Sequence, residues 1–503
     1  FLLLPVLQSI SLASGSNLPG KSQLPDAGAS KLPRWRGFNL LDKFNTAYGK
    51  PYKESDFKLI SELGFNFVRL PMDYRCWIKN NDWSQINETV LKDIDKAVQW
   101  GRKYKIHVNL NFHRAPGYCV NPPEEPLSIW TDSKAQEACA RHWAMFAKRY
   151  KGIPNSELSF NLINEPGDID GKIYSKVVRL LTDAIHKEDP GRLVIADGIA
   201  WASKPAEDLA GTGVAQSFHN YQPFEITHYK ASWINDADKM PLPRWPIPVI
   251  TNHLYGPYKP EYAGPMVING DFMEQSRLKI RVQVVSSMAR LKIKADGKVI
   301  FDKKLVSGPG KGEWKQEVYV KQWDIYQNIF DKDYTAVIPS GTRKVELEVV
   351  EGDWMTFSAI EIIIGASDKN RHINISPTKS DWGIKPCKLS IDEKNGKLTV
   401  KSDTEMGIDY IKGRFMEPWR LLAAKNTGVM VGEWGVHNRT PHEVTLSWMQ
   451  DCLREFRENG WGWALWNFSG SFGIVNSDRA DVKYEDYKGY KLDRKMLELL
   501  QKY

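Results

Sequence analysis

The stretch LSFNLINEPGD, residues Leu158–Asp168, decides the fold, because it is a short apolar run that ends abruptly in a carboxylate. Pro166 cannot donate a hydrogen bond to a neighbouring strand, so a strand must stop before it and leave Glu165 at its end. Uninterrupted apolar strands are typical of parallel sheets that are covered by helices on both faces. A glutamate at the mouth of such a strand is a candidate catalytic group.

Strand-like and helix-like segments alternate outward from this stretch. Six apolar runs are separated by segments whose apolar residues recur every three or four positions, as on one face of a helix. Gly or Pro-Gly marks the end of several of these segments. The expected strands are residues 34–40, 65–71, 105–112, 158–165, 192–198 and 214–221, with helices at 54–64, 89–104, 135–152 and 173–191.

The helical period disappears in residues 255–404, where apolar and polar residues alternate instead. Asp-Gly and Asn-Gly dipeptides lie where hairpin turns are expected. We therefore expect residues 255–404 to form a separate all-β domain, most simply a β-sandwich. Its expected strands are 277–284, 290–301, 343–350, 355–364 and 387–400.

The strand–helix alternation resumes in residues 405–503, with expected strands at 429–435 and 461–468. Eight strands that alternate with helices predict a (β/α)8 TIM barrel. The barrel then comprises residues 34–254 and 405–503, and the all-β, jelly-roll or β-sandwich-like domain is inserted after strand six.

Composition excludes several classes of function. The net charge of +8 over 503 residues is scattered among acidic residues, which indicates a solvated surface and no nucleic-acid partner. Five cysteines without CxxC spacing give no pattern for zinc, and no other metal or cofactor is expected. Nineteen tryptophans are a heavy load of the rings that line sugar-binding clefts, although a large aromatic core would also use them. We expect a monomer.

The chain opens with FLLLPVLQSISLASGS, which lacks a methionine. The apolar part is too short to span a bilayer, and Ser11-Leu12-Ala13 offers the small residues that a signal peptidase inspects. We interpret residues 1–15 as a signal-peptide remnant and 16–33 as a linker, which predicts a secreted or periplasmic protein with no membrane partner. An N-terminal segment packed on the domain is the alternative.

In (β/α)8 barrels the reactive groups lie at the C-terminal ends of the strands. Any one polar residue there could be a solvated or salt-bridged side chain, but six strand ends that converge on one mouth predict an active site. Two of them carry carboxylates, and a carboxyl pair that flanks a bond supplies the proton donor and the nucleophile of glycoside hydrolysis. The residues are Arg69, His113, Asn164 with Glu165, His219 with Tyr221, Glu433 and Trp466.

The same strand ends carry a resemblance to a known family. RGFNL, GFNFVRLP, NFHRAPGY, LINEP, SFHNY, GEWG and ALWNF occur in the order and spacing of glycoside hydrolase family 5, the cellulase-like enzymes of the retaining (β/α)8 clan. The resemblance covers residues 34–252 and 402–503. It implies that Glu165 is the acid/base and Glu433 the nucleophile.

The resemblance also implies roles for the other residues. Arg69 and Tyr221 would contact the nucleophile and keep it ionised. Asn164 would bind the sugar 2-hydroxyl, and Trp466 would form the platform beneath the sugar beside the cleaved bond. His113 and His219 would position these groups, and neither a metal nor a cofactor is implied.

The resulting prediction is a retaining glycoside hydrolase that acts on plant or microbial β-glycans, best described as an endo-β-1,4-glucanase. Exo-acting β-glucosidase, β-mannosidase or furanosidase activity and mannan or xyloglucan hydrolysis are the alternatives within the family. The non-enzyme alternative is an inactive sugar-binding barrel. For a retaining enzyme, the two carboxyl groups should lie roughly 5–5.5 Å apart.

Eight tryptophans have two possible roles. GDWMTFSAIEIII, residues 352–364, resembles the last strands of jelly-roll carbohydrate-binding modules. Trp314, Trp323, Trp354 and Trp382 could form a sugar platform on the inserted domain or belong to its core. Near the barrel strand ends, the same choice between further sugar subsites and core packing applies to Trp35, Trp77, Trp130 and Trp201.

Overall fold

The computed structural model describes residues 24–47, 49–365, 371–378, 382–394 and 397–503. The chain divides into two compact units, one of residues 1–243 with 411–503 and the other of residues 244–410. The expected signal-peptide remnant, residues 1–15, and residues 16–23 of the expected linker lie outside the described residues. Within the described part, no helix has the length and apolar character needed to cross a membrane.

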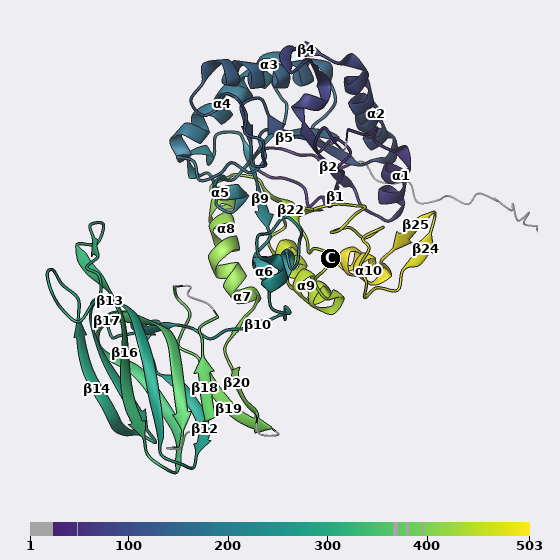
Figure 1. The fold of residues 1–503 in the computed structure, drawn as a ribbon. Helices are drawn as coiled ribbons and strands as arrows, with labels where there is room; N and C mark the ends of the chain where they lie inside the picture. Colours follow the sequence, from purple (N-terminus) through teal and green to yellow (C-terminus); the bar gives the residue numbers. More distant parts are fainter. Residues whose placement is uncertain (1–23, 48, 366–370, 379–381, 395–396) are drawn as a thin grey trace, which may run out of the picture. The chain divides into compact units, whose positions relative to one another are not determined.

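The first unit is a closed barrel of eight parallel strands, as predicted. The strands pair in the order β2-β1-β23-β22-β9-β8-β7-β5, and β5 pairs with β2 to close the ring. Helices surround the strands (Figure 1). The strands are β1 (Arg36–Asn39), β2 (Phe67–Asp73), β5 (His107–Ala115), β7 (Leu158–Asn161), β8 (Val194–Asp197), β9 (Ala215–Asn220), β22 (Val429–Trp434) and β23 (Gly462–Leu465).

The outer helices bury one face each. In α2, the apolar residues Leu91, Ile94 and Val98 recur at helical spacing and are buried against the barrel side of the helix. Burying each such side chain contributes about 1.5–3 kcal/mol. The longer helices are α1 (Glu54–Glu62), α2 (Glu88–Tyr104), α3 (Ser133–Arg149), α4 (Gly171–Glu188), α8 (Glu417–Ala423), α9 (His442–Glu458) and α10 (Arg494–Lys502).

A glycine allows β1 and β2 to approach closely. A Cβ atom on Gly37 would lie 1.7 Å from the backbone oxygen of Phe67, so no other residue fits at this position without moving the strand. The two strands pair in parallel with Gly37 opposite Phe67 and Asn39 opposite Arg69. The glycine of the RGFN run therefore sets the register that brings Asn39 beside Arg69.

An apolar layer closes the N-terminal end of the barrel interior. Trp35, Phe67 and Ile195 are fully buried there, together with small residues from β9 and β23. The ring of Trp35 stacks on Phe67 and on His107, with centroid distances of 5.1 and 3.9 Å. Trp35 is thus a core residue at the end of the barrel opposite the strand tips, and it is not a sugar subsite.

The second unit is an all-β domain inserted after the sixth barrel strand, β9. Its two ends pair with each other, because β10 (Ile247–Pro248) and β21 (Glu405–Met406) form an antiparallel ladder. The amide of Val249 also donates to the carbonyl of Thr404 over 2.9 Å. The unit spans residues 244–410, which includes the 255–404 expected from the loss of helical period. The first and last residues of the inserted domain therefore lie next to each other.

Two long strands organise this domain, where four shorter ones were expected. β13 (Ser276–Ala295) and β17 (Thr342–Ile364) pair antiparallel along most of their lengths. The expected strands 277–284 and 290–301 thus merge in part into β13, and 343–350 and 355–364 merge into β17. The expected Asp296-Gly297 hairpin turn is present, whereas the Asn395-Gly396 dipeptide lies outside the described residues.

The breaks in the alternating pattern are bulges within continuous strands. Ser287 and Gly352 have φ angles of 50° and 91°, and the β13–β17 register shifts beside them. A Cβ on Gly352 would lie 2.0 Å from the carbonyl oxygen of Met288, so glycine is required where the strands cross this bend. The apolar residues on both sides of the bend belong to one core.

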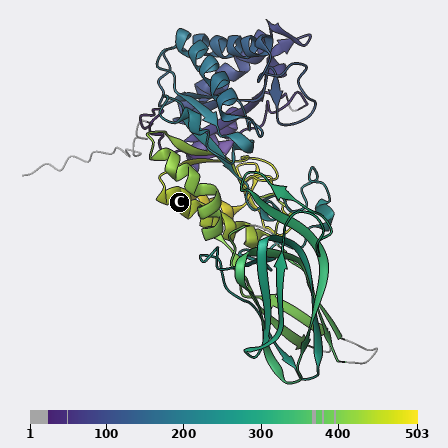
Figure 2. The same cartoon turned by 90° about the vertical axis from the view of Figure 1, so that its left-hand side faces the viewer.

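The remaining strands extend this pair into the sheets seen from a second side in Figure 2. β14 and β16 pair with β13, and β11, β12 and β18 pair with β17. These strands are β11 (His253–Tyr255), β12 (Met266–Phe272), β14 (Lys298–Val306), β15 (Tyr319–Val320), β16 (Ile325–Ile338), β18 (Arg371–Ile375), β19 (Lys388–Lys394) and β20 (Lys397–Ser402).

Candidate active site

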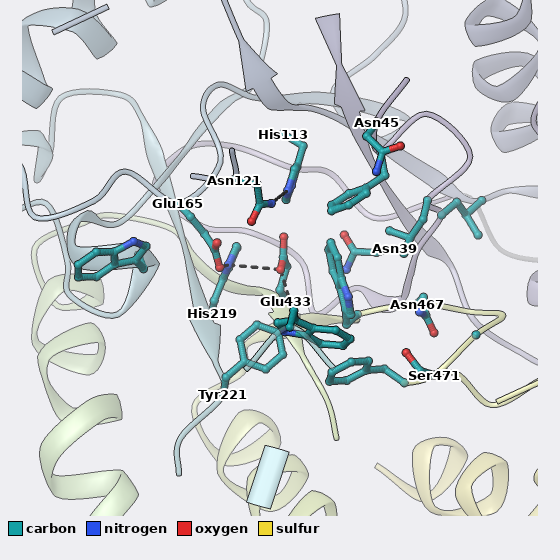
Figure 3. Close-up of a pocket in the computed structure, with 18 of the residues that line it drawn as sticks. Asn39, Asn45, His113, Asn121, Glu165, His219, Tyr221, Glu433, Asn467 and Ser471 are labelled. Atoms are coloured by element: carbon teal, nitrogen blue, oxygen red, sulfur yellow. Dashed lines mark hydrogen bonds and ion pairs between the residues drawn. The ribbon is translucent and has the colours of Figure 1, made fainter. Parts of the chain in front are cut away.

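The barrel holds a pocket of about 1030 Å³ at the C-terminal ends of its strands (Figure 3). Six of the eight residues predicted from the strand ends line it, namely His113, Glu165, His219, Tyr221, Glu433 and Trp466. The other two, Arg69 and Asn164, are buried and contact residues that line the pocket. The structure therefore brings the predicted set together.

Glu433 lies within β22 and both of its carboxylate oxygens accept hydrogen bonds. Arg69 Nη1 donates to Oε1 over 2.6 Å, and the hydroxyl of Tyr221 donates to Oε2 over 3.2 Å. The Glu433 side chain is only 4% exposed. This carboxylate is held by two donors on opposite oxygens, which fixes its orientation towards the pocket.

Arg69 reaches across the barrel interior from β2 and ties several strands together. Its guanidinium donates to Glu433 and to the side-chain oxygens of Asn39, Asn161 and Asn164, at distances of 2.6 to 3.0 Å. Four acceptors around one planar, permanently charged group stabilise it in this orientation. Arg69 thus fixes the relative positions of the β1, β7 and β22 ends.

Glu165 lies in the loop after β7, although the sequence pattern placed it at the end of the strand. β7 ends at Asn161, and Glu165 adopts a left-handed backbone conformation with φ 47°. Its amide donates to Asp197 Oδ2 over 3.1 Å, and its carbonyl accepts from the Tyr118 hydroxyl over 2.7 Å. A strained non-glycine residue anchored at both backbone groups is typical of active sites.

His219 connects the two glutamates. Its Nδ1 lies 2.7 Å from Glu165 Oε1 and 3.5 Å from Glu433 Oε2. One oxygen of each glutamate and one nitrogen of His219 all lie within 4.8 Å of one another. Figure 3 shows the three side chains converging on the centre of the pocket. Two carboxyl groups therefore face one small volume, with an imidazole between them.

Burial and neighbouring charges oppose each other at this centre. Burial raises the pKa of the Glu433 carboxyl above its ordinary value, and the charges of His219 and Arg69 only partly offset it. The resemblance implies that Arg69 and Tyr221 keep this carboxyl ionised, and the loss of solvent acts in the opposite direction. Burial alone would lower the pKa of His219, yet the charges of Glu433, Asp197 and Glu165 raise it above its usual value.

Aromatic rings form one wall of the pocket. Trp466 follows β23 directly, and its ring lies 6.0 Å from that of His113 and 5.6 Å from that of Phe44. The ring of Phe44 also lies 4.3 Å from that of His113, whose Nε2 is 3.3 Å from Asn121 Nδ2. Burial and the charges of Arg69 and His219 hold the pKa of His113 well below its usual value. His113 is therefore a neutral part of this wall.

Residues 27–246 match the family model for cellulase, glycosyl hydrolase family 5. This first part of the barrel is similar to glycosyl hydrolase family 5. Endoglucanase C of Acetivibrio thermocellus is 30% identical over 188 residues, which are 37% of this chain and 54% of the relative. Cellodextrinase A of Ruminococcus flavefaciens is 30% identical over 194 residues, 37% of this chain and 55% of its own. The chain thus spans about half the length of the curated relatives it matches.

Solved structures extend the likeness to most of the chain. A crystal structure of a glycoside hydrolase is 26% identical, with a TM-score of 0.59 over 93% of this chain and 99% of its own. Cel5A of Thermotoga maritima in complex with cellobiose is 15% identical, with a TM-score of 0.52 over 93% of this chain and 96% of its own. The second likeness concerns the fold alone.

The pattern of strand ends missed several residues of the site. Asn39 and Asp197 end β1 and β8 and are fully buried next to Arg69 and Glu165. Both stand in expected strands, residues 34–40 and 192–198, so reading every strand end would have found them. Phe44 and Trp233 line the pocket from loops and Phe224 lines it from the start of the short helix α6 (Phe224–Thr227), and none of the three carries a comparable signal.

The four tryptophans near the strand ends have different environments. Trp77 is fully buried and donates to His142 Nδ1 over 3.0 Å, so it belongs to the core as Trp35 does. Trp130 packs on Tyr118, with a centroid distance of 5.0 Å, and thereby supports the loop of Glu165. Trp201 lines the pocket with 55% of its surface exposed. Among the four, it has the surroundings of a sugar platform.

Glu165, His219 and Glu433 are close enough together to hold a metal ion. Their ligand atoms, however, are engaged with one another and with Arg69 and Tyr221. A guanidinium 2.6 Å from Glu433 also repels a cation at the same oxygen. The donor set therefore fits acid–base chemistry better than metal binding.

Proposed function

We propose that this chain is a retaining β-glycosidase that cleaves β-1,4-glucan internally. The proximity of the two carboxyl groups supports this most directly, since one oxygen of each lies within 4.8 Å of the other. Inverting enzymes need carboxyl groups about 6.5–9.5 Å apart, to leave room for a water molecule. The spacing here fits direct attack by a carboxylate.

Glu433 is the nucleophile in this mechanism. Its carboxylate attacks the anomeric carbon and forms the glycosyl–enzyme bond, while the bond from that carbon to the leaving oxygen breaks. Arg69 and Tyr221 hold the carboxylate in one orientation, so little reorganisation is needed for attack. As the bond to the leaving oxygen breaks, positive charge develops on the sugar ring in an oxocarbenium-like transition state.

Glu165 is the acid and then the base. It gives its proton to the leaving oxygen in the first step and takes a proton from water in the second, when the glycosyl bond to Glu433 is hydrolysed. Its side chain is 18% exposed, in contrast to the buried Glu433, which leaves access for the leaving group and the water. Asn164, oriented by its bond to Arg69, is placed to bind the 2-hydroxyl.

The pocket and the relatives favour a chain of sugars as the substrate. A volume of about 1030 Å³ is at the upper end of the usual range of roughly 300–1000 Å³ for ligand pockets. Exposed rings of Trp201, Phe224 and Trp233 line it in addition to Trp466. The relatives described above are named endoglucanase and cellodextrinase. Hydrolysis of mannan or xyloglucan and exo action are alternatives that differ in subsites and not in chemistry.

A product analysis tests this function. With a soluble β-1,4-glucan, internal cleavage predicts a rapid loss of viscosity while few reducing ends appear, and the β-anomer as the first product by NMR. Release of a single sugar from the outset would indicate exo action, and an α-anomer would contradict the retaining mechanism. No hydrolysis of any aryl β-glycoside by the wild-type chain would favour the inactive sugar-binding barrel.

We also propose that the inserted domain, residues 244–410, binds the polymer. Trp323 and Trp382 are 59% and 39% exposed, which supports a role as sugar platforms. Trp354 packs beside Trp382, and Trp314 packs against the domain core through Phe330. Replacing Trp323 and Trp382 together by Ala should reduce retention on insoluble cellulose and leave aryl glycoside hydrolysis unchanged. Equal retention would contradict this role. Export of the protein stays a prediction.

A further inference from the structure

A buried carboxylate beneath the catalytic pair has no role in the mechanism so far. Asp197 ends β8 and its side chain is fully buried, and it is absent from the lining of the pocket. It therefore cannot touch the substrate from this position. Its backbone carbonyl accepts from the Tyr174 hydroxyl over 2.6 Å, and its Oδ1 accepts from Asn161 Nδ2 over 2.9 Å. These bonds hold the carboxylate in a fixed orientation.

The other oxygen of Asp197 faces three catalytic groups. Oδ2 accepts from the amide of Glu165 over 3.1 Å and lies 3.4 Å from His219 Nε2 and 3.6 Å from Arg69 Nη2. His219 therefore has a carboxylate at each ring nitrogen, because its Nδ1 faces Glu165. Among the described residues Nε2 has no hydrogen-bond partner, so Asp197 acts on the ring through its charge at 3.4 Å. An imidazolium is attracted to both carboxylates, whereas a neutral imidazole carries no charge to pair with either.

The balance of charges in the site also favours a protonated His219. His219 faces Glu165, Glu433 and Asp197, and the charge of Arg69, the neutral ring of His113 and the Tyr221 hydroxyl lie around it. With Asp197 and Glu433 ionised and Arg69 charged, a protonated His219 makes the site neutral while Glu165 still carries its proton. Low-dielectric surroundings favour this neutral combination.

We propose that Asp197 is a positioning residue whose negative charge keeps His219 as an imidazolium and also offsets the effect of that cation on Glu165, so that Glu165 keeps its catalytic proton. This inference rests on the proposed glycosidase function. The imidazolium donates from Nδ1 to Glu165 Oε1, so the proton of the carboxyl group lies on Oε2. When the glycosidic bond breaks, that proton passes to the leaving oxygen, and the attacking water later returns one to Glu165. The His219 proton stays in place throughout.

The isosteric change Asp197→Asn tests this role, since it removes the charge and keeps the shape. The same protonated site would then carry an extra positive charge and release a proton more readily. We expect the alkaline limb of kcat/KM to move about 1 unit or more to lower pH. The loss at neutral pH should be larger for an aryl glycoside with a poor leaving group than for an activated one, because only the former needs the proton.

A second buried Asp–His pair supplies the matched control. Asp493 lies 2.8 Å from His442 Nε2, both side chains are buried, and neither lines the pocket. Asp493→Asn should lower the melting temperature without moving either limb of the profile. An unmoved alkaline limb in a folded Asp197→Asn variant would overturn the proposal and leave Asp197 a structural residue.

NMR of the wild-type chain with ¹⁵N-labelled histidine covers the case in which Asp197→Asn fails to fold. We expect both ring nitrogens of His219 to be protonated at neutral pH, with the signal assigned by its loss in His219→Gln. A neutral imidazole would overturn the proposal. Hydrolysis of an activated aryl glycoside by the wild-type chain separates the proposed glycosidase function from the proposed role of Asp197. Absence of hydrolysis would refute the function, while the His219 signal would still report on the charge state that Asp197 is proposed to maintain.

Discussion

Arg69 on β2 and Glu433 on β22 are joined by a 2.6 Å hydrogen bond across the barrel interior, although two other strands separate β2 from β22 in the sheet. The pair is nearly inaccessible to solvent, with side chains 1% and 4% exposed. The bond holds the Glu433 carboxylate in place because the guanidinium is itself held by three asparagines. Removing either partner leaves the other charge buried.

Arg69→Met should therefore destabilise the barrel strongly. Loss of one partner of a buried ion pair costs about 3–5 kcal/mol of unfolding free energy at neutral pH. Burial already raises the pKa of Glu433, and without Arg69 it rises further. A carboxyl whose pKa is raised on folding destabilises the folded state most at high pH and least below its unfolded pKa. The loss of unfolding free energy caused by Arg69→Met should therefore become smaller as the pH falls from 7 to 5. Urea unfolding at both pH values measures this, and an equal deficit would contradict it.

Tyr221→Phe should move the acid limb of kcat/KM. Activity is lost as pH falls through the pKa of Glu433, which burial raises, so the limb should lie above the ordinary glutamate value of about 4.3. The Tyr221 hydroxyl stabilises the ionised form, and its removal should shift the limb to higher pH. Loss of one hydrogen bond to a charged group, about 1.5–3 kcal/mol, predicts a fall in kcat/KM of about 10- to 100-fold.

Tyr150→Phe is the control for this change, because its hydroxyl also donates to a carboxylate, Asp95 Oδ1, over 3.0 Å, outside the pocket. It should leave the whole profile in place. If Tyr221→Phe left the acid limb where it is, another group would set that limb.

The two glutamates should respond differently to truncation. Glu433→Ala removes the nucleophile and should abolish hydrolysis of every substrate, with azide restoring some turnover as an α-glycosyl azide. Glu165→Ala should retain activity on substrates with good leaving groups, since these need little proton donation. Kinetics on an activated and an unactivated aryl glycoside make the comparison. Identical behaviour of the two variants would reverse or refute the assigned roles.

Replacing residues 244–410 with a short Gly/Ser linker should leave a folded barrel. The ends of this segment pair through Ile247 and Met406, so the barrel strands on either side need not move to be joined. None of the residues that contact Glu165 or Glu433 belongs to the segment. Hydrolysis of small aryl glycosides should persist, and circular dichroism checks the fold. An unfolded product would show that the barrel depends on the inserted domain.

The barrel and most of its site could be predicted because both depend on local patterns. Each barrel strand is a short apolar run bounded by turn residues, and the residues at its end identify the mouth. Asp197 was missed although it ends such a run, since an Asp-Gly pair after a strand also fits an ordinary turn. Only the structure shows that this side chain points under Glu165.

Two features lie beyond any local pattern. The bends at Ser287 and Gly352 interrupt the alternation of β13 and β17, and a bulge and a turn leave the same trace in sequence. The pKa of Glu433 depends on how completely the fold removes water, which the identity of its neighbours does not reveal. The charged partners of Glu433 can be predicted from the residues at the strand ends, but the extent to which water is excluded from it can be seen only in the folded barrel.

The ladder between β10 and β21 has a consequence for the order of folding. The sixth barrel strand, β9, ends at Asn220 and the seventh, β22, begins at Val429. During synthesis, the first six strands therefore remain an incomplete barrel until the segment between these residues has been made. A folded insert brings Ile247 and Met406 together and shortens the effective loop that the ring has to close. Because closure entropy grows logarithmically with loop length, a roughly fourfold shortening lowers its free-energy cost by about 1.2 kcal/mol. Folding of the insert therefore lowers the entropic cost of joining β22 to the six strands before it.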